Sequence, residues 1–190
     1  MVSAPPEDDR DVVARCLAGE RAAERELFRR ERSRVHATLY RILGSNREID
    51  DLVQETFLEV FRSLASFRGE AKLATWIDRI AVRVAYRSFG RKRPVLLEST
   101  PEVGEDPEAE RRAQAREGVR RLYAILAGMS PGSRIAFALH VIDGRPIAEV
   151  AGLLGTAVVT AKLRIWRARR EIARRAAADP VLAELLEEST

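Results

Sequence analysis

The sequence predicts an all-α protein in which two helical parts are joined by a flexible linker. Alternating β-branched residues, which mark strands, are rare, while Ala, Leu, Arg and Glu dominate the 190 residues. Apolar residues recur at spacings of three and four, and a stretch rich in Pro and acidic residues divides the chain. Because 46% of the residues are hydrophobic, the chain can form packed cores, which excludes a disordered protein.

The first half, residues 10–93, is expected to form a bundle of four helices with short loops. The helices are predicted at Asp11–Ala18, about Glu20–Leu43, about Glu48–Ala65 and about Leu73–Lys92. Gly19 and Gly44 follow the first two, because glycine readily adopts the left-handed backbone that ends a helix. Pro94 follows the fourth and cannot continue it.

Charge is distributed unevenly over the rest of the chain. Residues 94–118 hold three Pro and carry a net charge of −4, which predicts a flexible acidic linker, with a helical pattern resuming near Glu108. Residues 119–175 hold 11 basic and 3 acidic side chains, so this block is a candidate surface for a polyanion; an Arg-rich solvated face is the alternative. Residues 176–190 are expected to be a short C-terminal extension.

The basic block has the pattern of a helix-turn-helix domain. Ser130-Pro131 opens one helix, a second is expected over Pro146–Leu154, and Gly155–Ala157 forms a tight turn that needs the freedom of glycine. The helix after the turn carries an inward stripe of Val158, Ala161, Ile165 and Ala168. Its other faces carry Thr160, Lys162, Leu163, Arg164 and Arg167. This division is typical of a recognition helix in the major groove of DNA; a helical hairpin with a charged outer face is the alternative.

Nothing in the sequence indicates an enzyme, a metal site or a cofactor. His36 and His140 are the only histidines and lack ligands at metal-binding spacing, and no phosphate-binding loop is present. The single Cys16 shares a helix stripe with Val12 and Val13, so it is expected to be buried. No apolar run approaches the 18 residues of a membrane span, and the acidic start lacks a secretory signal, so a cytoplasmic protein is expected.

Both halves resemble the extracytoplasmic-function (ECF) sigma factors of bacteria. The segments "DLVQETF" and "FRGEAKLATWIDRIA" are similar to signatures of the family's second conserved region. The segment "MSPGSRIAFALHVIDGRPIAEVAGLLGTAVVTAKLRIWRARREI" is similar to its fourth. The resemblance covers about residues 10–175, with the acidic linker between the two regions.

This resemblance implies a transcription initiation factor that binds bacterial core RNA polymerase and directs it to promoter DNA. The first domain would bind the polymerase and open the minus-ten element, and the helix-turn-helix would bind the minus-thirty-five element. The resemblance points to polymerase contacts at Asp51, Gln54 and Glu55, for which a solvated helix face is the alternative. In the first domain it points to DNA contacts at Arg68, Lys72, Trp76, Arg79, Arg83, Tyr86 and Arg87. The place of Trp76 on an apolar stripe favours core packing instead.

The sequence departs from the family pattern at several of these positions. Arg83 replaces the usual Asn, an acidic residue is usual near Arg87, and small residues are usual around Val159 and Leu163. Two alternatives therefore stay open: a stand-alone helix-turn-helix regulator, and a sigma-derived adaptor that binds polymerase without melting DNA. Family members are commonly held inactive by an anti-sigma protein, although nothing in this chain names such a partner.

Overall fold

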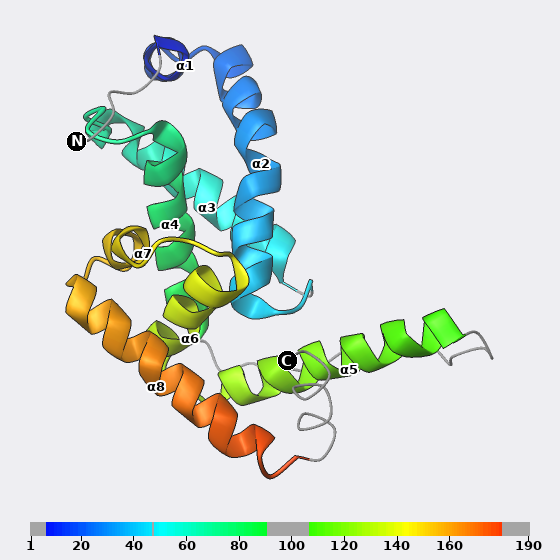
Figure 1. Ribbon diagram of the computed structural model, residues 1–190. Helices are drawn as coiled ribbons and strands as arrows, with labels where there is room; N and C mark the ends of the chain where they lie inside the picture. The colour runs from blue at the N-terminus through cyan, green and yellow to red at the C-terminus, as the bar shows by residue number, and fades with distance from the viewer. Residues whose placement is uncertain (1–6, 47, 91–106, 180–190) are drawn as a thin grey trace.

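The computed structural model describes residues 7–46, 48–90 and 107–179, and over these residues it is helical, with no strand. In chain order the elements are α1 (Glu7–Leu17), α2 (Arg21–Leu43), α3 (Ile49–Ser63), η1 (Leu64–Ser66), α4 (Leu73–Ser88), α5 (Pro107–Ala127), α6 (Pro131–Phe137), η2 (Ala138–Ile142), α7 (Ile147–Leu153) and α8 (Val158–Ala176). Figure 1 shows α1 to α4 in the upper part of the molecule and α5 to α8 in the lower part. The expected all-α fold is confirmed.

The N-terminal half is built on α2, α3 and α4, each of which packs against the other two. Leu27, Leu39 and Ile42 of α2 and Ile77 and Ile80 of α4 are fully buried in its core. Leu39 and Ile42, like Ile77 and Ile80, are three residues apart, which places each pair on one face of its helix, as the sequence pattern predicted. Cys16 is also buried, in agreement with its expected packing role.

The first turn of α4 is held by Asp9, a residue of α1 at the start of the N-terminal half. The backbone N–H of Leu73, which has no acceptor inside its own helix, donates to Asp9 of α1 at 3.1 Å. Arg30 of α2 pairs with the other Asp9 oxygen at 2.8 Å, so the buried carboxylate is held on both sides. A negative charge at a helix N-terminus is favourable, and this contact fixes the loop before α4 against α1.

The C-terminal half has the predicted helix-turn-helix. Its second and third helices are α7 and α8, and Gly155 between them has φ +60°, the left-handed conformation expected for the turn. The helix before them ends in a π-helical segment, η2, in which Asp143 N–H donates to the carbonyl of Ala138, five residues back. Together α6, α7 and α8 form a compact three-helix unit, with α5 packed against α8.

The two halves share one hydrophobic core, which the sequence analysis did not predict. Helix α6 and α7 pack against α4, and η2 packs against α2. Ile135, Leu139 and Val150 of the C-terminal half are completely buried in the same cluster as Leu39 and Ile80. Burial of this kind is favourable at about 25 cal/mol per Å² of apolar surface, so the compact arrangement has an apolar driving force.

The structure corrects the expected linker boundary. Helix α5 starts at Pro107, so residues 107–118 of the predicted linker 94–118 are helical. Proline suits the first turn of a helix because its missing N–H has no partner there, and the following Glu, Ala and Arg residues favour helix. Residues 94–106 and the extension from residue 180 onward lie outside the described residues.

Candidate nucleic-acid and polymerase interface

Helix α8 is fixed to its domain by a narrow apolar stripe. Ala161 and Ala168 are almost completely buried and Ile165 is 5% exposed, as predicted. Val158 was expected on the same stripe, but it is 42% exposed, because it is the first residue of the helix and lies beside the turn. The small alanines allow α8 to approach α6 closely, so that its opposite face is presented to solvent.

The predicted DNA contacts of α8 differ in how freely they can reach a ligand. Lys162 and Arg167 are exposed, and Leu163 is 42% exposed. Thr160 and Arg164 are half-buried. The guanidinium of Arg164 lies over Gly132 of α6, so close that a Cβ added at Gly132 would be 3.1 Å from its Cζ. Arg164 therefore packs partly against its own domain.

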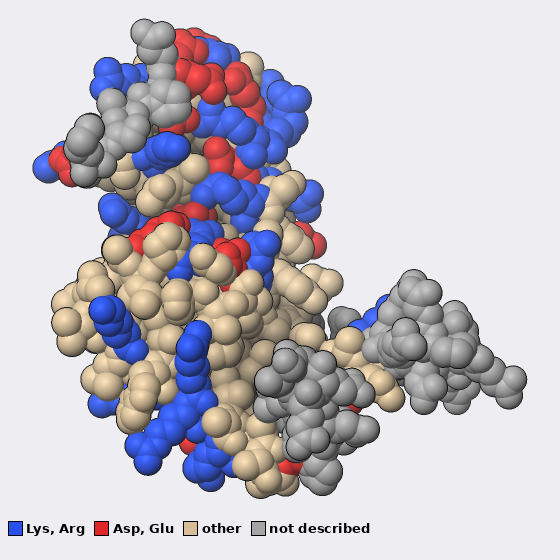
Figure 2. Space-filling model, in the orientation of Figure 1, with Lys and Arg blue, Asp and Glu red and all other residues tan. Residues whose placement is uncertain are grey.

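The C-terminal half of α8 carries further arginines, two of which are already paired. Arg174 and Arg175 both donate to Glu171, and their guanidinium groups lower the pKa of that carboxyl to about 2. Figure 2 shows Lys and Arg with few acidic residues around α8, whereas both charges mix around α1 and α2. The predicted basic surface therefore exists on α8, and among the described residues its cations outside ion pairs lie between Lys162 and Arg170, before the cluster around Glu171.

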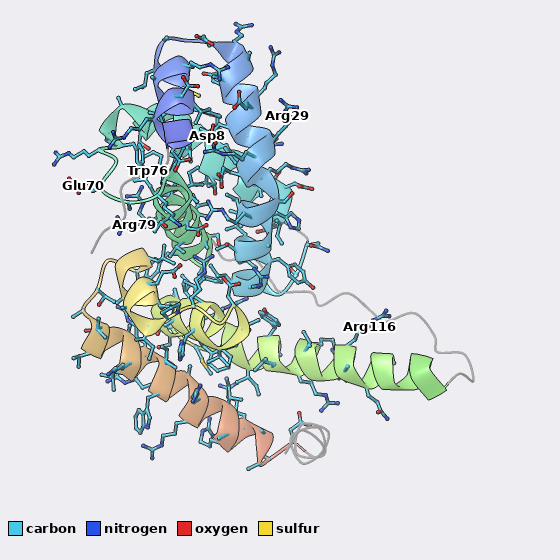
Figure 3. The ribbon with its side chains drawn as sticks, turned by 45° about the horizontal axis from the view of Figure 1, so that its top comes forward. Asp8, Arg29, Glu70, Trp76, Arg79 and Arg116 are labelled. Atoms are coloured by element: carbon cyan, nitrogen blue, oxygen red, sulfur yellow. The ribbon has the colours of Figure 1, made fainter. Side chains whose placement is uncertain are left out.

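Helix α4 carries most of the candidate DNA contacts of the first half. Arg83 and Tyr86 are exposed, with Tyr86 at 49%. Trp76 is half-buried, packs against the core and lies with its ring 5.6 Å from that of Phe67, so the packing role favoured for it is present. Arg79 lies on the side of α4 that faces α7 (Figure 3), with a terminal nitrogen near Gly152.

Arg87 joins two predicted sites that the sequence analysis treated as separate. Its guanidinium pairs with Glu55 of α3 at 3.2 Å and also with Glu59, one turn further along the same helix. The predicted DNA contact Arg87 and the predicted polymerase contact Glu55 thus neutralise each other in this structure.

The exposed face of α3 carries the other polymerase candidates. Asp51 and Gln54 are exposed, three residues apart on the same face. Leu58, which the sequence analysis did not single out, lies one turn beyond Gln54 and is 55% exposed. Its position outside the apolar stripe of α3 was the signal that could have found it, because a large apolar side chain on a polar face suits a contact surface.

The loop between η1 and α4 presents the two remaining candidates. Arg68 and Lys72 are exposed on either side of Gly69, whose φ of +69° turns the chain. Trp76 lies one turn into α4, beside this loop (Figure 3). The structure thus gathers Arg68, Lys72 and Trp76 at one end of α4, held in place by the contact between Leu73 and Asp9.

Two profiles of one protein family match the chain: sigma-70 region 2 over residues 27–94 and sigma-70, region 4 over residues 119–172. The chain is also 31% identical over 178 residues to the ECF RNA polymerase sigma-E factor of Haemophilus influenzae. That alignment covers 86% of this chain and 93% of the relative. The chain belongs to the ECF sigma factors.

Two further comparisons agree with this assignment. The sigma factor is 30% identical over 152 residues to the ECF RNA polymerase sigma factor SigE of Mycolicibacterium smegmatis; the alignment covers 77% of this chain and 59% of that relative. The solved structure of CnrH in complex with the cytosolic domain of CnrY superposes with a TM-score of 0.63 and 27% identity, covering 90% of this chain and 98% of that one. A transcription initiation factor that directs RNA polymerase to promoters, as the resemblance implied, is thereby confirmed.

Two arginines link the halves of the sigma factor, Arg134, which is buried, and Arg145, which is half-buried; the sequence pattern predicted neither contact. Arg134 of α6 donates to the carbonyls of Ile42 at 3.0 Å and Leu43 at 2.6 Å, and its guanidinium lies 4.5 Å from the centre of the Phe89 ring. Burial lowers the pKa of Arg134 to about 10. A cation at the C-terminal end of α2 compensates for the unpaired carbonyls there.

The second of these arginines is Arg145, which precedes α7. It pairs with buried Asp78 of α4 at 2.8 Å and donates to Thr38 of α2 at 3.0 Å. It also pairs with Asp143, which in turn pairs with Arg41 of α2 at 2.8 Å. The contacts between the halves are therefore polar and specific as well as apolar.

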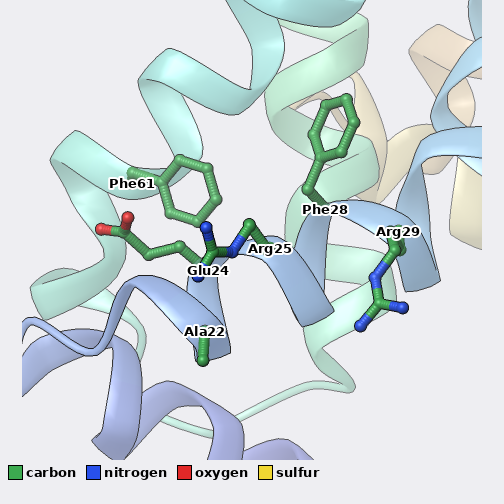
Figure 4. A pocket seen from close by; sticks show the side chains of 6 residues that line it. All are labelled: Ala22, Glu24, Arg25, Phe28, Arg29 and Phe61. Atoms are coloured by element: carbon green, nitrogen blue, oxygen red, sulfur yellow. The ribbon is translucent and has the colours of Figure 1, made fainter.

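A surface hollow lies apart from both candidate DNA-binding surfaces. Its volume is about 530 Å³, and Figure 4 shows it between α2 and α3. The residues that line it are Ala22, Glu24, Arg25, Phe28, Arg29 and Phe61. Among the residues that the structure describes, no group of three or more His, Cys, Asp or Glu could hold a metal ion. Within the same residues, no helix is long and apolar enough to cross a membrane.

Proposed function

We propose that this sigma factor uses α8 to bind the minus-thirty-five element and α4, with the loop before it, to bind and open the minus-ten element. The observation that carries the proposal is the outer face of α8: Lys162 and Arg167 are exposed on a helix whose back is fixed by Ala161, Ile165 and Ala168. A helix held in this way places its first turns in the major groove while its basic residues contact phosphates.

Opening of the minus-ten element needs favourable contacts with the melted strand, because unstacking a base costs a few kcal/mol. Arg68 and Lys72 supply cations for single-strand phosphates, and the accessible part of Trp76 supplies an aromatic surface beside them. Arg83 and Tyr86 extend this surface along α4. Binding energy for the melted strand, without ATP, would then drive opening, and the protein itself would be no enzyme and would need no cofactor.

The polymerase contact would use the exposed face of α3. Asp51 and Gln54 offer a charge and a hydrogen-bonding amide, and Leu58 adds apolar area between them and the end of the helix. Glu55 would take part only if it exchanged Arg87 for a basic residue of the polymerase, since the two pair in this structure. Asp51, Gln54 and Leu58 are therefore the sharper test of polymerase binding.

A protein that controls the sigma factor would bind both halves together. The similar structure of CnrH contains the cytosolic domain of CnrY. The shared core of this chain offers such a partner a preformed compact target. Core polymerase, promoter DNA and such an anti-sigma protein would meet the sigma factor in the bacterial cytoplasm.

The experiment that tests the function is run-off transcription with purified core RNA polymerase and DNA from upstream of the coding region. We expect a specific transcript that appears only when the protein is added. Binding to core polymerase without any transcript from a randomised promoter library would instead indicate an adaptor, and DNA binding without polymerase would indicate a stand-alone regulator.

Variants of single residues separate the two surfaces. Arg167→Ala should weaken transcription and promoter binding about tenfold and leave core polymerase binding unchanged, because one or two phosphate contacts are lost. Asp51→Ala with Gln54→Ala should weaken core polymerase binding, and transcription should fall with it. Arg10→Ala is the matched control: it removes one exposed arginine from α1, outside both matched regions, and should change neither property.

A further inference from the structure

The centre of the outer face of α8 is apolar, although the helix as a whole is basic. Val159 is 76% exposed, Leu163 42% and Trp166 53%. Each residue of a helix turns by about 100°, so these three point within about 50° of the direction opposite to the buried stripe of Ala161, Ile165 and Ala168. At positions i, i+4 and i+7, the three side chains form a continuous line on the face of α8 that is turned away from the protein.

Basic side chains flank this line on both sides. By the same geometry, Lys162 and Arg169 lie on one side of it and Arg167 on the other, and all three are exposed. Arg170 closes the line beyond Trp166, with its guanidinium 5.4 Å from the centre of the indole ring. A ligand that fits must therefore be apolar in the middle and anionic along both edges.

The major groove of B-DNA has this character where it contains thymine. It is about 12 Å wide, its walls are phosphate backbones, and the C5-methyl group of thymine projects from its floor. A protein helix as the ligand would need acidic residues along both of its edges, whereas duplex DNA carries two lines of anions in every sequence. The charge pattern favours DNA.

We propose that Val159 and Leu163 read the methyl groups of thymines in the minus-thirty-five element; this rests on the proposed role of α8 as recognition helix. The two residues are four apart, a rise of about 6 Å along the helix. Base pairs are about 3.4 Å apart, so the two side chains reach methyl groups one or two steps apart. Lys162, Arg167 and Arg169 contact the phosphates on either side and contribute affinity without this selectivity.

The position of each side chain along α8 supports this division. Val159 and Leu163 lie in the first two turns, which is the part of a recognition helix that contacts base edges. Trp166 lies in the third turn, beside Arg170, where the helix leaves the groove. The departure from the small residues of the family pattern thus has a chemical meaning: this helix exchanges hydrogen-bonding readout for contact with methyl groups.

The test removes the methyl group alone. Deoxyuridine pairs as thymidine does but lacks the C5-methyl, so a promoter obtained by run-off selection with the reconstituted holoenzyme is resynthesised with one deoxyuridine at a time in its upstream element. Binding of the holoenzyme to each duplex is then measured. Burial of one methyl changes affinity about fourfold. We expect affinity to fall about fourfold at each of two neighbouring positions, and about 15-fold when both are changed.

Variants identify the side chains that read the methyl groups. Leu163→Ala should lower affinity for the thymine duplex and make the protein insensitive to deoxyuridine at one position, and Val159→Ala should do so at the other. Lys162→Ala should weaken binding to all duplexes and keep the deoxyuridine effect. Leu17→Ala, which shortens an exposed leucine of α1, should change nothing.

Three results would overturn the inference or its basis. A holoenzyme that transcribes normally but binds thymine and deoxyuridine duplexes equally would refute methyl reading and leave the proposed function intact. Unchanged DNA binding by Leu163→Ala and Val159→Ala together would assign the apolar line to a protein partner instead. Absence of any transcript from the selection would refute the proposed function itself.

Discussion

Replacing Arg134 by methionine should uncouple the two halves of the protein. Methionine keeps the apolar stem and removes the guanidinium that donates to the Ile42 and Leu43 carbonyls. The burial penalty of the cation disappears with it, so the main loss comes from two acceptors left without donors. Each unpaired buried acceptor costs about 1–3 kcal/mol, and we expect the contact between the halves to weaken by about 3 kcal/mol.

The chain contains a reporter for each half. It has two tryptophans, Trp76 in α4 and Trp166 in α8. Single-tryptophan proteins made with Trp166→Phe and with Trp76→Phe report the urea unfolding of the N-terminal and C-terminal halves separately. The wild type should show coincident transitions, because the halves share a core.

In the Arg134→Met background the transitions should separate. With an m-value of about 1–2 kcal/mol/M for domains of this size, about 3 kcal/mol corresponds to a shift of roughly 2 M urea in the midpoint of the less stable half. Arg169→Met, which removes an exposed arginine from α8, should leave both transitions in place. Coincident and unshifted transitions in Arg134→Met would refute the reasoning, because they would show that the two bonds do not hold the halves together.

Three other perturbations follow from the geometry. Gly44→Ala should destabilise the protein by at least about 2 kcal/mol in urea unfolding, because Gly44 has φ +74° and the new Cβ would lie 2.2 Å from the Tyr123 ring. Gly19→Ala, with φ +81° and no neighbour within 4 Å, should show the cost of the backbone strain alone. An equal loss of unfolding free energy in the two variants would contradict the clash. Burial raises the pKa of Tyr123 to about 12, so its neutral form stabilises the fold fully below pH 10, and this stability is lost as pH rises through about 12. Tyr123→Phe should remove the phenolate absorbance step near pH 12, and a step that persists there would refute the assignment. Arg174 and Arg175 lower the pKa of Glu171, so its ionised carboxylate stabilises α8 above about pH 4.5, and this contribution is lost as pH falls toward about 2. Glu171→Gln should lower the helix content measured by circular dichroism at pH 7, and that content should change little between pH 4.5 and 2. An acid transition identical to that of the wild type would refute this role of Glu171.

Most of the fold could be predicted from the sequence because helices leave a local signal. The spacing of the apolar stripes and the positions of the glycines predicted the bounds of α2, α3 and α7, and the start of α8, to within a few residues. Helix α5 begins within one residue of Glu108, where the helical pattern is predicted to resume. Only the extent of the linker was wrong, because acidic residues and prolines suit a linker and a helix N-terminus equally well. Val158 was misplaced because helical spacing gives its angle around the helix and says nothing of its place at the exposed end.

The contacts that join distant segments could not be predicted. Asp9 caps α4 across 64 residues, and Arg134 reaches carbonyls more than 90 residues away. The sequence shows such side chains as ordinary surface charges, since nothing local identifies their partners. For the same reason Arg87 and Glu55 were assigned to different ligands, although they pair with each other.

The shared core limits how far the protein can reach. The minus-ten and minus-thirty-five elements are about 25 base pairs apart by their names, which is roughly 85 Å of duplex, whereas a compact chain of this length has a radius of gyration of about 16 Å. Because α4 contacts α7, the two proposed DNA-binding surfaces would occupy one promoter only after the halves separate. The apparent affinity for a whole promoter is then the intrinsic affinity multiplied by the fraction of molecules that are open. On the proposed function, the contacts of Arg134 and Arg145 would oppose initiation thermodynamically, and a protein that only strengthened the closed form would silence the promoter without covering a single proposed DNA contact.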